Sequence, residues 1–265
     1  MAERGSHVTE RPPVVILCGG KGTRLAGEVQ ALPKALVEIG DRPILWHIMK
    51  GYAFHGFTEF ILCLGYQGEQ IERYVGDQRN GFKRGWRVTC LSTGLETNTG
   101  GRLKQVEPLI GQQRFLATYG DGLSDINIER LVEFHHRKGR LATMSCVRPM
   151  SPFGLARLDR ADRVVGFEEK PVLDHWVNGG FFVFEPGIFS YLTDDAVLER
   201  DALPKLAADR QLSAYRYRGF WKCMDTYKDT LVLNQLWQTG EAPWARWDHL
   251  LQPAPKKRGA VAVCS

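Results

Sequence analysis

Short apolar runs alternate with amphipathic stretches along this chain. Residues 14–18 and 60–64 are rich in β-branched and other apolar side chains, and each run is followed by glycine, as expected of buried parallel strands. Between them, the segments 44–49 and 52–54 place apolar side chains at helical spacing, and Gly56 is a suitable stop. This order predicts a βαβ unit at the start of the fold.

The same alternation continues to about residue 239. Further strands are predicted at 88–91, 115–119, 142–147, 179–184 and 212–217, and further helices at 70–74, 128–138, 188–192, 202–209 and 226–239. Residues 153–167 alternate and turn as an antiparallel hairpin does. The pattern predicts an α/β fold with a doubly wound, mostly parallel mixed sheet and a small antiparallel hairpin region.

The length of 265 residues suits one such domain. We expect it to span 14–244, between a flexible N-terminal segment at 1–13 and a loose C-terminal tail at 245–265 that is rich in Pro, Ala and basic residues. The N-terminal residues lack an apolar signal core, and no window approaches the roughly 18 apolar residues of a membrane span. We therefore expect a cytoplasmic protein with no membrane partner.

Composition excludes several other classes. The apolar and charged shares, 43% and 25%, are ordinary for a soluble globular protein. The net charge of +5 comes in part from Lys256, Lys257 and Arg258 in the predicted tail, so it does not imply a nucleic-acid partner. Six dispersed cysteines without a Cys-x-x-Cys pair indicate neither a zinc site nor a disulfide framework.

A glycine-rich loop follows the first predicted strand. Gly19, Gly20 and Gly22 leave backbone N–H groups free to close around phosphate oxygens. Thr23 adds a hydroxyl donor, and Arg24 adds a fixed positive charge. The loop has neither the ending of a Walker loop nor the glycine spacing of the dinucleotide fingerprint. A plain turn is the alternative, but the adjoining Thr-Arg pair favours a triphosphate site.

Two aspartates are candidate metal ligands. Asp121, after Gly120, follows a predicted strand, where ligands bind in open α/β sheets, and Asp225 precedes the last predicted helix. Carboxylates at such a place can hold Mg²⁺ between substrate phosphates. Taken singly, Asp121 is more typical of a turn and Asp225 of a helix N-cap. As a pair in this context, they favour the metal site.

Together these motifs resemble the sugar-1-phosphate nucleotidyltransferases, whose signature is a Gly-Thr-Arg loop followed after a short gap by a lysine. Lys34 stands ten residues after Arg24. The resemblance covers about residues 14–244 and implies a Rossmann-like nucleotidyltransferase fold. It also implies that Arg24 and Lys34 contact the phosphates in catalysis and that Asp121 and Asp225 bind Mg²⁺ together.

Two further motifs gain a role only from the resemblance. It implies that Lys170 binds the sugar phosphate, that Asn178, next to Gly179, meets the sugar hydroxyls, and that acidic residues such as Glu168 orient the sugar. Without the other motifs these residues would be an ordinary charged loop and turn.

Within the family, several stretches are most similar to the enzymes that act on CTP and glucose 1-phosphate: 37–40, 43–50, 99–104, 119–122 and 219–221. On this resemblance Arg102 contacts the triphosphate, CTP and a sugar 1-phosphate are the substrates, and the protein is a homo-oligomer. The segment 74–97 looks shorter than in those enzymes, and Leu32 and Ala35 depart from their usual residues around the lysine. Base choice, sugar choice and subunit contacts therefore stay open.

Three alternatives remain beside this prediction. The first is transfer from UTP or dTTP to a heptose or modified hexose 1-phosphate. The second is a catalytically silent sugar-nucleotide sensor, which the retention of Arg24, Lys34, Asp121 and Asp225 disfavours. The third is a glycosyltransferase, which would lack the Gly-Thr-Arg loop and normally carries a tight Asp-x-Asp motif.

Overall fold

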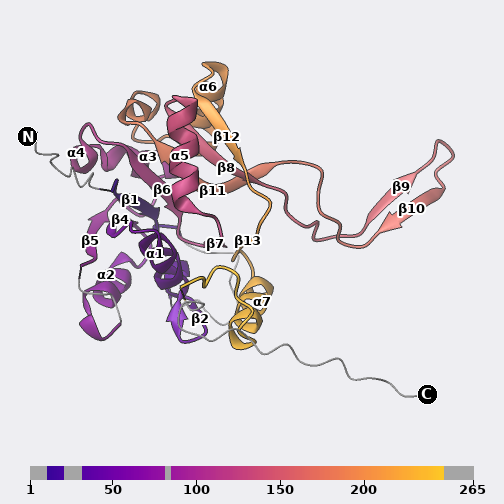
Figure 1. Cartoon of the computed structure of the whole chain (residues 1–265), viewed down its shortest axis with the longest axis horizontal. Coiled ribbons are helices and arrows are strands. Elements are labelled where there is room, and N and C mark those ends of the chain that lie inside the picture. The colour runs from indigo at the N-terminus through magenta and orange to yellow at the C-terminus, as the bar shows by residue number, and fades with distance from the viewer. Residues whose placement is uncertain (1–10, 21–31, 81–84, 248–265) are drawn as a thin grey trace, which may run out of the picture.

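A seven-stranded sheet forms the centre of the computed structural model, which describes residues 11–20, 32–80 and 85–247 (Figure 1). The strand order is β12-β8-β11-β6-β1-β4-β5. In chain order these strands are β1 (Val14–Leu17), β4 (Glu59–Leu64), β5 (Arg87–Ser92), β6 (Phe115–Tyr119), β8 (Ala142–Val147), β11 (Val177–Phe184) and β12 (Leu212–Arg216). Only β11 runs antiparallel to its neighbours in this sheet. The predicted mostly parallel mixed sheet is confirmed.

Helices cover both faces of the sheet, because alternate side chains of its central strand enter different cores. Val14 and Ile16 belong to one buried cluster and Val15 to the other. The first cluster includes residues of α1 (Ile44–Phe54), α2 (Gly68–Gly76), α5 (Ile128–Lys138) and α7 (Tyr227–Gln238). The second includes residues of α3 (Thr99–Gln105), α4 (Glu107–Ile110), α6 (Leu203–Ala208), the 3-10 helix η4 (Pro186–Tyr191) and the π-helix η5 (Leu198–Ala202). This is the doubly wound arrangement expected.

Short elements shape the edges of the body. The ribbon of β7 (Gly122–Ser124) and β13 (Trp221–Cys223) and the ribbon of β2 (Glu38–Ile39) and β3 (Arg42–Pro43) are both antiparallel. Single 3-10 turns form at η2 (Lys34–Leu36) and η3 (Gln78–Asn80). The β7–β13 ribbon matters most for function, because it brings residue 225 beside residue 121.

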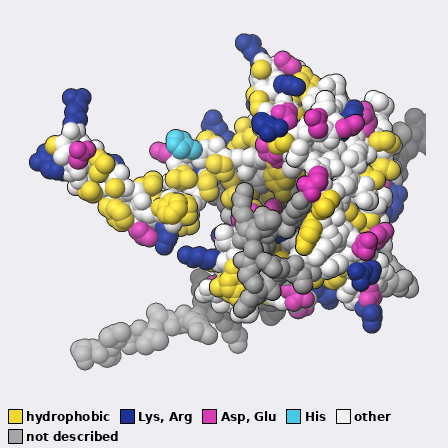
Figure 2. Space-filling view, turned by 180° about the vertical axis from the view of Figure 1, so that it is seen from behind, with side chains coloured by type: hydrophobic (Ala, Val, Ile, Leu, Met, Phe, Trp, Pro, Cys, Tyr) yellow, Lys and Arg dark blue, Asp and Glu magenta, His cyan; other side chains and the backbone are white. Residues whose placement is uncertain are grey.

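An antiparallel ribbon extends from the body between β8 and β11 (Figure 1). It consists of β9 (Leu155–Leu158) and β10 (Val164–Glu168), and an isolated bridge between Met150 and Val172 pairs its two sides closer to the body. We call residues 150–172 the arm. The hairpin predicted at 153–167 is confirmed, and Figure 2 shows apolar side chains along the arm.

Two residues of the segment predicted as a loose C-terminal tail, Ala245 and Trp247, are buried. Trp244, Ala245 and Trp247 are buried in the cluster that α1 belongs to, and the ring of Trp247 meets that of Trp46 edge-on at 6.0 Å. Two indole rings remove a large apolar area from water, so this segment packs rather than trails. Arg11, in the N-terminal segment expected to be flexible, pairs with Glu129 at 2.6 Å.

Across the described ranges, the structure contains no helix that is both long and apolar enough to cross a membrane.

Candidate active site

Lys34 lies between two aspartates from distant parts of the chain. Its Nζ donates to Asp121 Oδ2 at 2.6 Å and to Asp225 Oδ1 at 2.8 Å. Asp121 follows the carboxyl end of β6, and Asp225 follows β13. The backbone N–H of Met224 donates to the carbonyl of Asp121 at 2.9 Å and holds the two loops together. The sequence predicted all three residues, and the structure brings them into one cluster.

The two carboxylates keep Lys34 charged. Burial alone would lower the pKa of this ammonium group, but the charge of Asp121 and hydrogen bonds to both aspartates outweigh it and raise the pKa. The side chain of Lys34 is only 16% exposed. A cation is therefore fixed where negatively charged phosphates could approach.

Asp225 does not cap the last helix, although its position next to that helix suggested it. The N-cap of α7 is Thr226, whose hydroxyl accepts from the backbone of Asp229 while the carboxylate of Asp229 accepts from the N–H of Thr226. This reciprocal pair is a capping box. It leaves the carboxylate of Asp225 available to Lys34.

The same corner offers a possible cation site. One ligand atom each from Asp121, Cys223 and Asp225 lies within 4.8 Å of the others. Burial, and then the charges of both aspartates, raise the pKa of the Cys223 thiol. Two of the three ligand atoms are carboxylate oxygens, and oxygen ligands suit a hard cation such as Mg²⁺ better than sulfur does.

A cavity of about 480 Å³ opens beside this cluster. Its lining combines the glycine loop, Lys34, the start of α3 and the end of β6, and it includes the predicted residues Gly19, Gly20, Lys34, Arg102, Gly120 and Asp121. The volume lies within the usual range of small-molecule sites. The structure thus collects the described residues predicted to bind nucleotide around one cavity next to the two aspartates.

Arg102 supports the glycine loop from beneath. Its buried guanidinium donates to the carbonyls of Leu64 at 2.9 Å and Gly19 at 3.2 Å, and also to the Thr93 hydroxyl. A Cβ on Gly19 would lie 2.1 Å from Arg102 Nη1, so a larger residue would displace this guanidinium from its hydrogen bonds. Arg102 lines the cavity, but much of its hydrogen-bonding capacity is used by the protein.

Comparison with known proteins agrees with this geometry. Residues 13–237 match the nucleotidyl transferase family. The chain belongs to that family. It is 42% identical over 252 residues to a probable glucose-1-phosphate cytidylyltransferase of Bacillus subtilis and 41% identical over 255 residues to the glucose-1-phosphate cytidylyltransferase of Salmonella typhimurium. Each match covers 88% of this chain and 99% of the relative.

Solved structures show the same fold for this nucleotidyl transferase. HddC from Yersinia pseudotuberculosis superposes with a TM-score of 0.68 at 22% identity, covering 86% of this chain and all of HddC. A UDP-glucose pyrophosphorylase in complex with UDP-glucose superposes with a TM-score of 0.67 at 16% identity, covering 86% of this chain and 99% of that one. At these identities the similarity concerns the fold alone.

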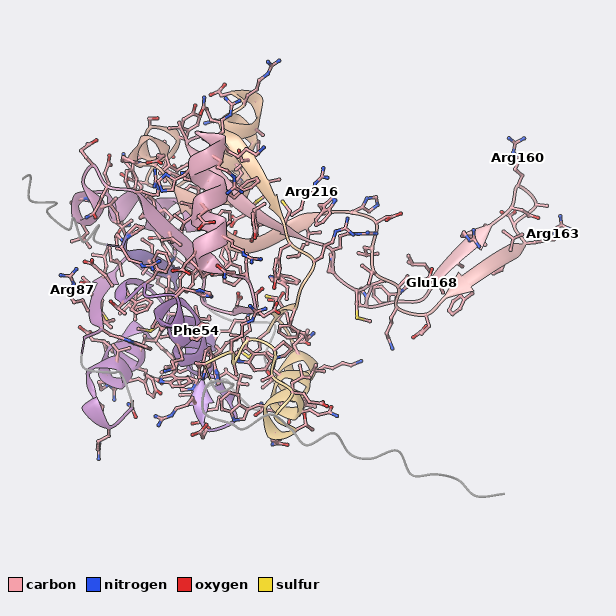
Figure 3. The ribbon with its side chains drawn as sticks, in the orientation of Figure 1. Phe54, Arg87, Arg160, Arg163, Glu168 and Arg216 are labelled. Atoms are coloured by element: carbon pink, nitrogen blue, oxygen red, sulfur yellow. The ribbon has the colours of Figure 1, made fainter. Side chains whose placement is uncertain are left out.

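The remaining predicted residues of this nucleotidyl transferase lie in different places. Asn178 and Gly179 lie near the start of β11, and the Gly179 carbonyl accepts from the indole N–H of Trp221, the first residue of β13, at 2.7 Å. Glu168 ends β10 on the arm, well away from the body in Figure 3. Lys170 is paired with Glu169 at 3.1 Å. The structure does not bring Glu168 and Lys170 to the Lys34 cluster.

Gly22, Thr23 and Arg24 lie outside the described residues, so their roles stay predictions. Sequence reasoning also missed polar residues around the nucleotidyl transferase site. Tyr119 lines the cavity, and its hydroxyl bonds to Asn178 and Glu199. The adjacent Gly-Asp-Gly motif could have pointed to Tyr119. Glu199 gives no such signal, because its neighbours in sequence form no motif.

Proposed function

We propose that this nucleotidyl transferase moves a cytidylyl group from CTP to a sugar 1-phosphate, glucose 1-phosphate or a close relative, and releases pyrophosphate. The observation that carries the proposal is the Lys34, Asp121 and Asp225 cluster beside a cavity lined by the glycine loop. The choice of CTP and of the sugar rests on the two cytidylyltransferase relatives at 42% and 41% identity. We place the reaction in the cytoplasm, where nucleoside triphosphates are available.

In the proposed reaction an oxygen of the sugar phosphate attacks the α-phosphorus of CTP in line with the leaving pyrophosphate. A bond forms between this oxygen and the α-phosphorus as the bond from the α-phosphorus to the oxygen bridging to the β-phosphate breaks. The attacking oxygen is already anionic, so the step needs no general base. Repulsion between anions is the main barrier, and it is lowered by charge and positioning.

The cluster residues divide this work. Lys34, which its aspartate partners keep protonated, supplies positive charge for the phosphates. Arg24 adds a second charge by its place in the glycine loop. Asp121 and Asp225 fit a Mg²⁺ ion, which when bound would neutralise phosphate charge.

On the acceptor side, we propose that Asn178 contacts the sugar hydroxyls, with Gly179 beside it, and that Lys170 and Glu168 bind and orient the sugar phosphate. Asn178 lies two residues before Gly180, at an irregularity in the pairing of β11, and the N–H of Gly180 donates to Asn178 Oδ1 at 2.8 Å. Glu168 and Lys170 can bind the sugar phosphate only if the arm that carries them reaches a Lys34 cluster. The arm is therefore part of the proposed site.

We also propose that the protein works as a homo-oligomer. Large apolar side chains of the arm are exposed to solvent: Met150, Phe153, Leu155, Leu158, Val164, Val165, Phe167 and Val172. Phe153 is 73% exposed and Phe167 is 68% exposed. A two-stranded ribbon is at best marginally stable alone in water, and contiguous apolar surface favours association. We propose that a second copy of the chain covers these apolar side chains.

The experiment is a measurement of pyrophosphate release with CTP, UTP, dTTP, ATP and GTP against a panel of sugar 1-phosphates with Mg²⁺. We expect the highest specificity constant with CTP, because a pocket that hydrogen-bonds the cytosine amino group leaves buried acceptors unpaired when uracil enters. A higher value for another triphosphate would overturn the cytidylyl assignment.

Asp121→Asn and Asp225→Asn test the cluster in the same assay. Each removes an anionic ligand, so we expect turnover to fall by orders of magnitude with an unchanged circular dichroism spectrum. Asp209→Asn is the control, since the side chain of this exposed aspartate accepts from the Tyr191 hydroxyl, away from the cluster. Full activity in both cluster variants would contradict the proposed mechanism.

A further inference from the structure

A chain of hydrogen bonds connects the acceptor side of the site to the helix that supports the glycine loop. Asn178 Nδ2 donates to the Tyr119 hydroxyl at 2.9 Å, and that hydroxyl donates to Glu199 Oε1. The other oxygen of Glu199 accepts from the Thr99 hydroxyl at 2.7 Å. Thr99 is the first residue of α3, which also carries Arg102.

The carboxylate of Glu199 fixes the direction of this chain. An ionised carboxylate only accepts hydrogen bonds, so the proton of the Tyr119 hydroxyl must point to Glu199. That leaves the hydroxyl only a lone pair for Asn178, which must present its NH₂ group. The backbone N–H of Gly180 holds the other end of the amide by donating to Asn178 Oδ1. The orientation of the Asn178 amide is thus set from both sides.

Packing fixes Tyr119 as a link between Asn178 and Glu199. A phenol hydroxyl can donate one hydrogen bond and accept another, as the bonds to Glu199 and from Asn178 require. Its ring stands edge-on to Phe182 at 5.8 Å. A Cβ on Gly180 would lie 2.7 Å from Tyr119 Cδ2, and Gly180 has a φ of +78°, so glycine permits the close approach.

Glu199 is held in place by an unusual backbone. It lies in the π-helix η5, a form that is rare and often occurs at functional sites. The N–H of Leu198 donates to the Thr99 hydroxyl at 3.0 Å, and the N–H of Gly101 donates to the Ala196 carbonyl at 3.0 Å. This segment therefore packs directly on the start of α3. Glu199 itself is exposed, although Tyr119 is not.

The location of these hydrogen bonds argues against a purely structural function. Tyr119 and Thr99 both line the cavity beside Lys34, and Glu199 is open to solvent rather than enclosed in a core. Exposed hydrogen bonds add little to folding stability because water competes for them. They can still fix the orientation of a neighbouring amide.

We propose that Glu199 is a positioning residue for the sugar: acting through Tyr119, it holds the Asn178 amide in the orientation that meets the hydroxyls of the sugar 1-phosphate. The same carboxylate also accepts from Thr99, but the start of α3 is held independently by the backbone of residues 196 and 198, so we expect little effect on the nucleotide side. This inference rests on the proposed transfer to a sugar 1-phosphate and names residues that set its sugar specificity.

The test is steady-state kinetics of Glu199→Gln and Tyr119→Phe with CTP and glucose 1-phosphate. We expect the Michaelis constant for the sugar phosphate to rise about tenfold, the effect of misplacing one hydrogen-bond partner, while that for CTP changes less than about twofold. Glu107→Gln is the matched control, because this carboxylate is also half-exposed and paired, to Lys104, but belongs to α4. It should leave both constants unchanged.

A double variant separates positioning from general damage. If Glu199 acts only through Tyr119, the two changes together should raise the Michaelis constant for the sugar no more than the larger single change does. The variants should also discriminate less than wild type against sugar 1-phosphates that lack one ring hydroxyl. Glu199→Gln is nearly isosteric at an exposed position, so it carries the test alone if Tyr119→Phe does not fold.

The outcomes are distinct. An active wild type with unchanged sugar kinetics in Glu199→Gln overturns this inference and leaves the proposed function standing. An equal rise of both Michaelis constants, or additive effects in the double variant, also overturns it. A wild type that turns over no sugar phosphate overturns the proposed function itself.

Discussion

Lys34 shows how single charged residues are balanced in this site. An ammonium group loses hydration when it is buried, which by itself favours the neutral amine. Asp121 and Asp225 reverse that preference by placing two carboxylate oxygens within 2.8 Å. The two loops that carry these aspartates meet at the same corner and together raise the pKa of the lysine. Its charge is therefore a property of the fold as much as of the residue.

We expect Lys34→Ala to lower kcat by roughly 100-fold or more with little change in the Michaelis constants, because a fixed cation matters most as charge rearranges at the α-phosphorus. Lys104→Ala is the control, since Lys104 is a partly buried lysine of α3 that pairs with Glu107 and does not line the cavity. Initial rates over a matrix of both substrates measure the two effects. A change confined to a Michaelis constant would show that Lys34 only binds substrate.

At the same scale, the sequence predicts some site residues and not others. Asp121 and Asp225 each stand at the end of a recognisable strand or before a helix, so topology brings them together. Glu199 could not be found in this way. Its role depends on a π-helix and on contacts to residues 80 and 100 positions away, neither of which leaves a periodic pattern.

The element α1 contains a buried histidine whose protonation is linked to stability. In the neutral ring that fits this site, Nε2–H of His47 donates to the Ile39 carbonyl at 2.8 Å and Nδ1 accepts from the Trp244 indole N–H at 3.3 Å. Protonation would turn Nδ1 into a second donor facing that indole. Burial lowers the pKa of His47 from 6.5 to about 4.

We therefore expect acid to destabilise the fold through His47. Its folded-state pKa is depressed, so the unfolded chain takes up the proton first, and stability is lost as pH falls from 6.5 toward 4. The loss is at most about 3 kcal/mol. Denaturant unfolding across this range measures it. His47→Gln keeps one donor and one acceptor without titrating, so it should show a smaller loss; an equal loss would assign the effect to His55 and His135, whose pKa values burial also lowers.

Element boundaries could be predicted where local signals are strong. Residues 128–138 form α5 as expected, because the Asn127 side chain caps its first turn and Gly139 ends it in a left-handed conformation. The ribbon of β7 and β13 was missed. Strands of three residues are too short for alternation to be recognised, and their pairing joins segments about 100 residues apart.

At the scale of the whole molecule, the arm is the feature that does not pack on its own body. Figures 1 and 2 show it extending to one side with apolar side chains along its length. Natural proteins rarely leave such a surface uncovered. Local alternation predicted the ribbon, but no local pattern could predict whether the ribbon folds back or extends.

We expect Phe153→Ser combined with Phe167→Ser to shift the protein toward monomer, since each removes an aromatic side chain that is more than two-thirds exposed. Sedimentation velocity over a range of concentrations measures the mass. Leu109→Ser is the control, because Leu109 is an exposed apolar residue of α4 rather than of the arm. A monomeric wild type, or an unchanged mass in the double variant, would contradict self-association through the arm.

Mixing two inactive variants shows which cluster the arm serves. Lys170→Ala has an intact Lys34 cluster, and Asp121→Asn has an intact arm. Because the arm extends away from its own body, we expect co-expressed variants to recover part of the turnover that each lacks alone. The separately purified variants are the controls. Mixed assemblies that stay inactive would show that each arm completes the site of its own chain.

The place of the arm in the topology has an energetic consequence. β8 and β11 lie side by side, with Val147 directly opposite Val177, so a short turn could join them. Residues 148–176 form a long excursion instead. Closing a loop costs more entropy as it lengthens, and a four-residue turn here would reduce that cost by at most about 2 kcal/mol. A single subunit with the arm is thus less stable than the same fold with a short turn. A variant in which a four-residue turn replaces residues 148–176 should unfold at a higher temperature and remain monomeric.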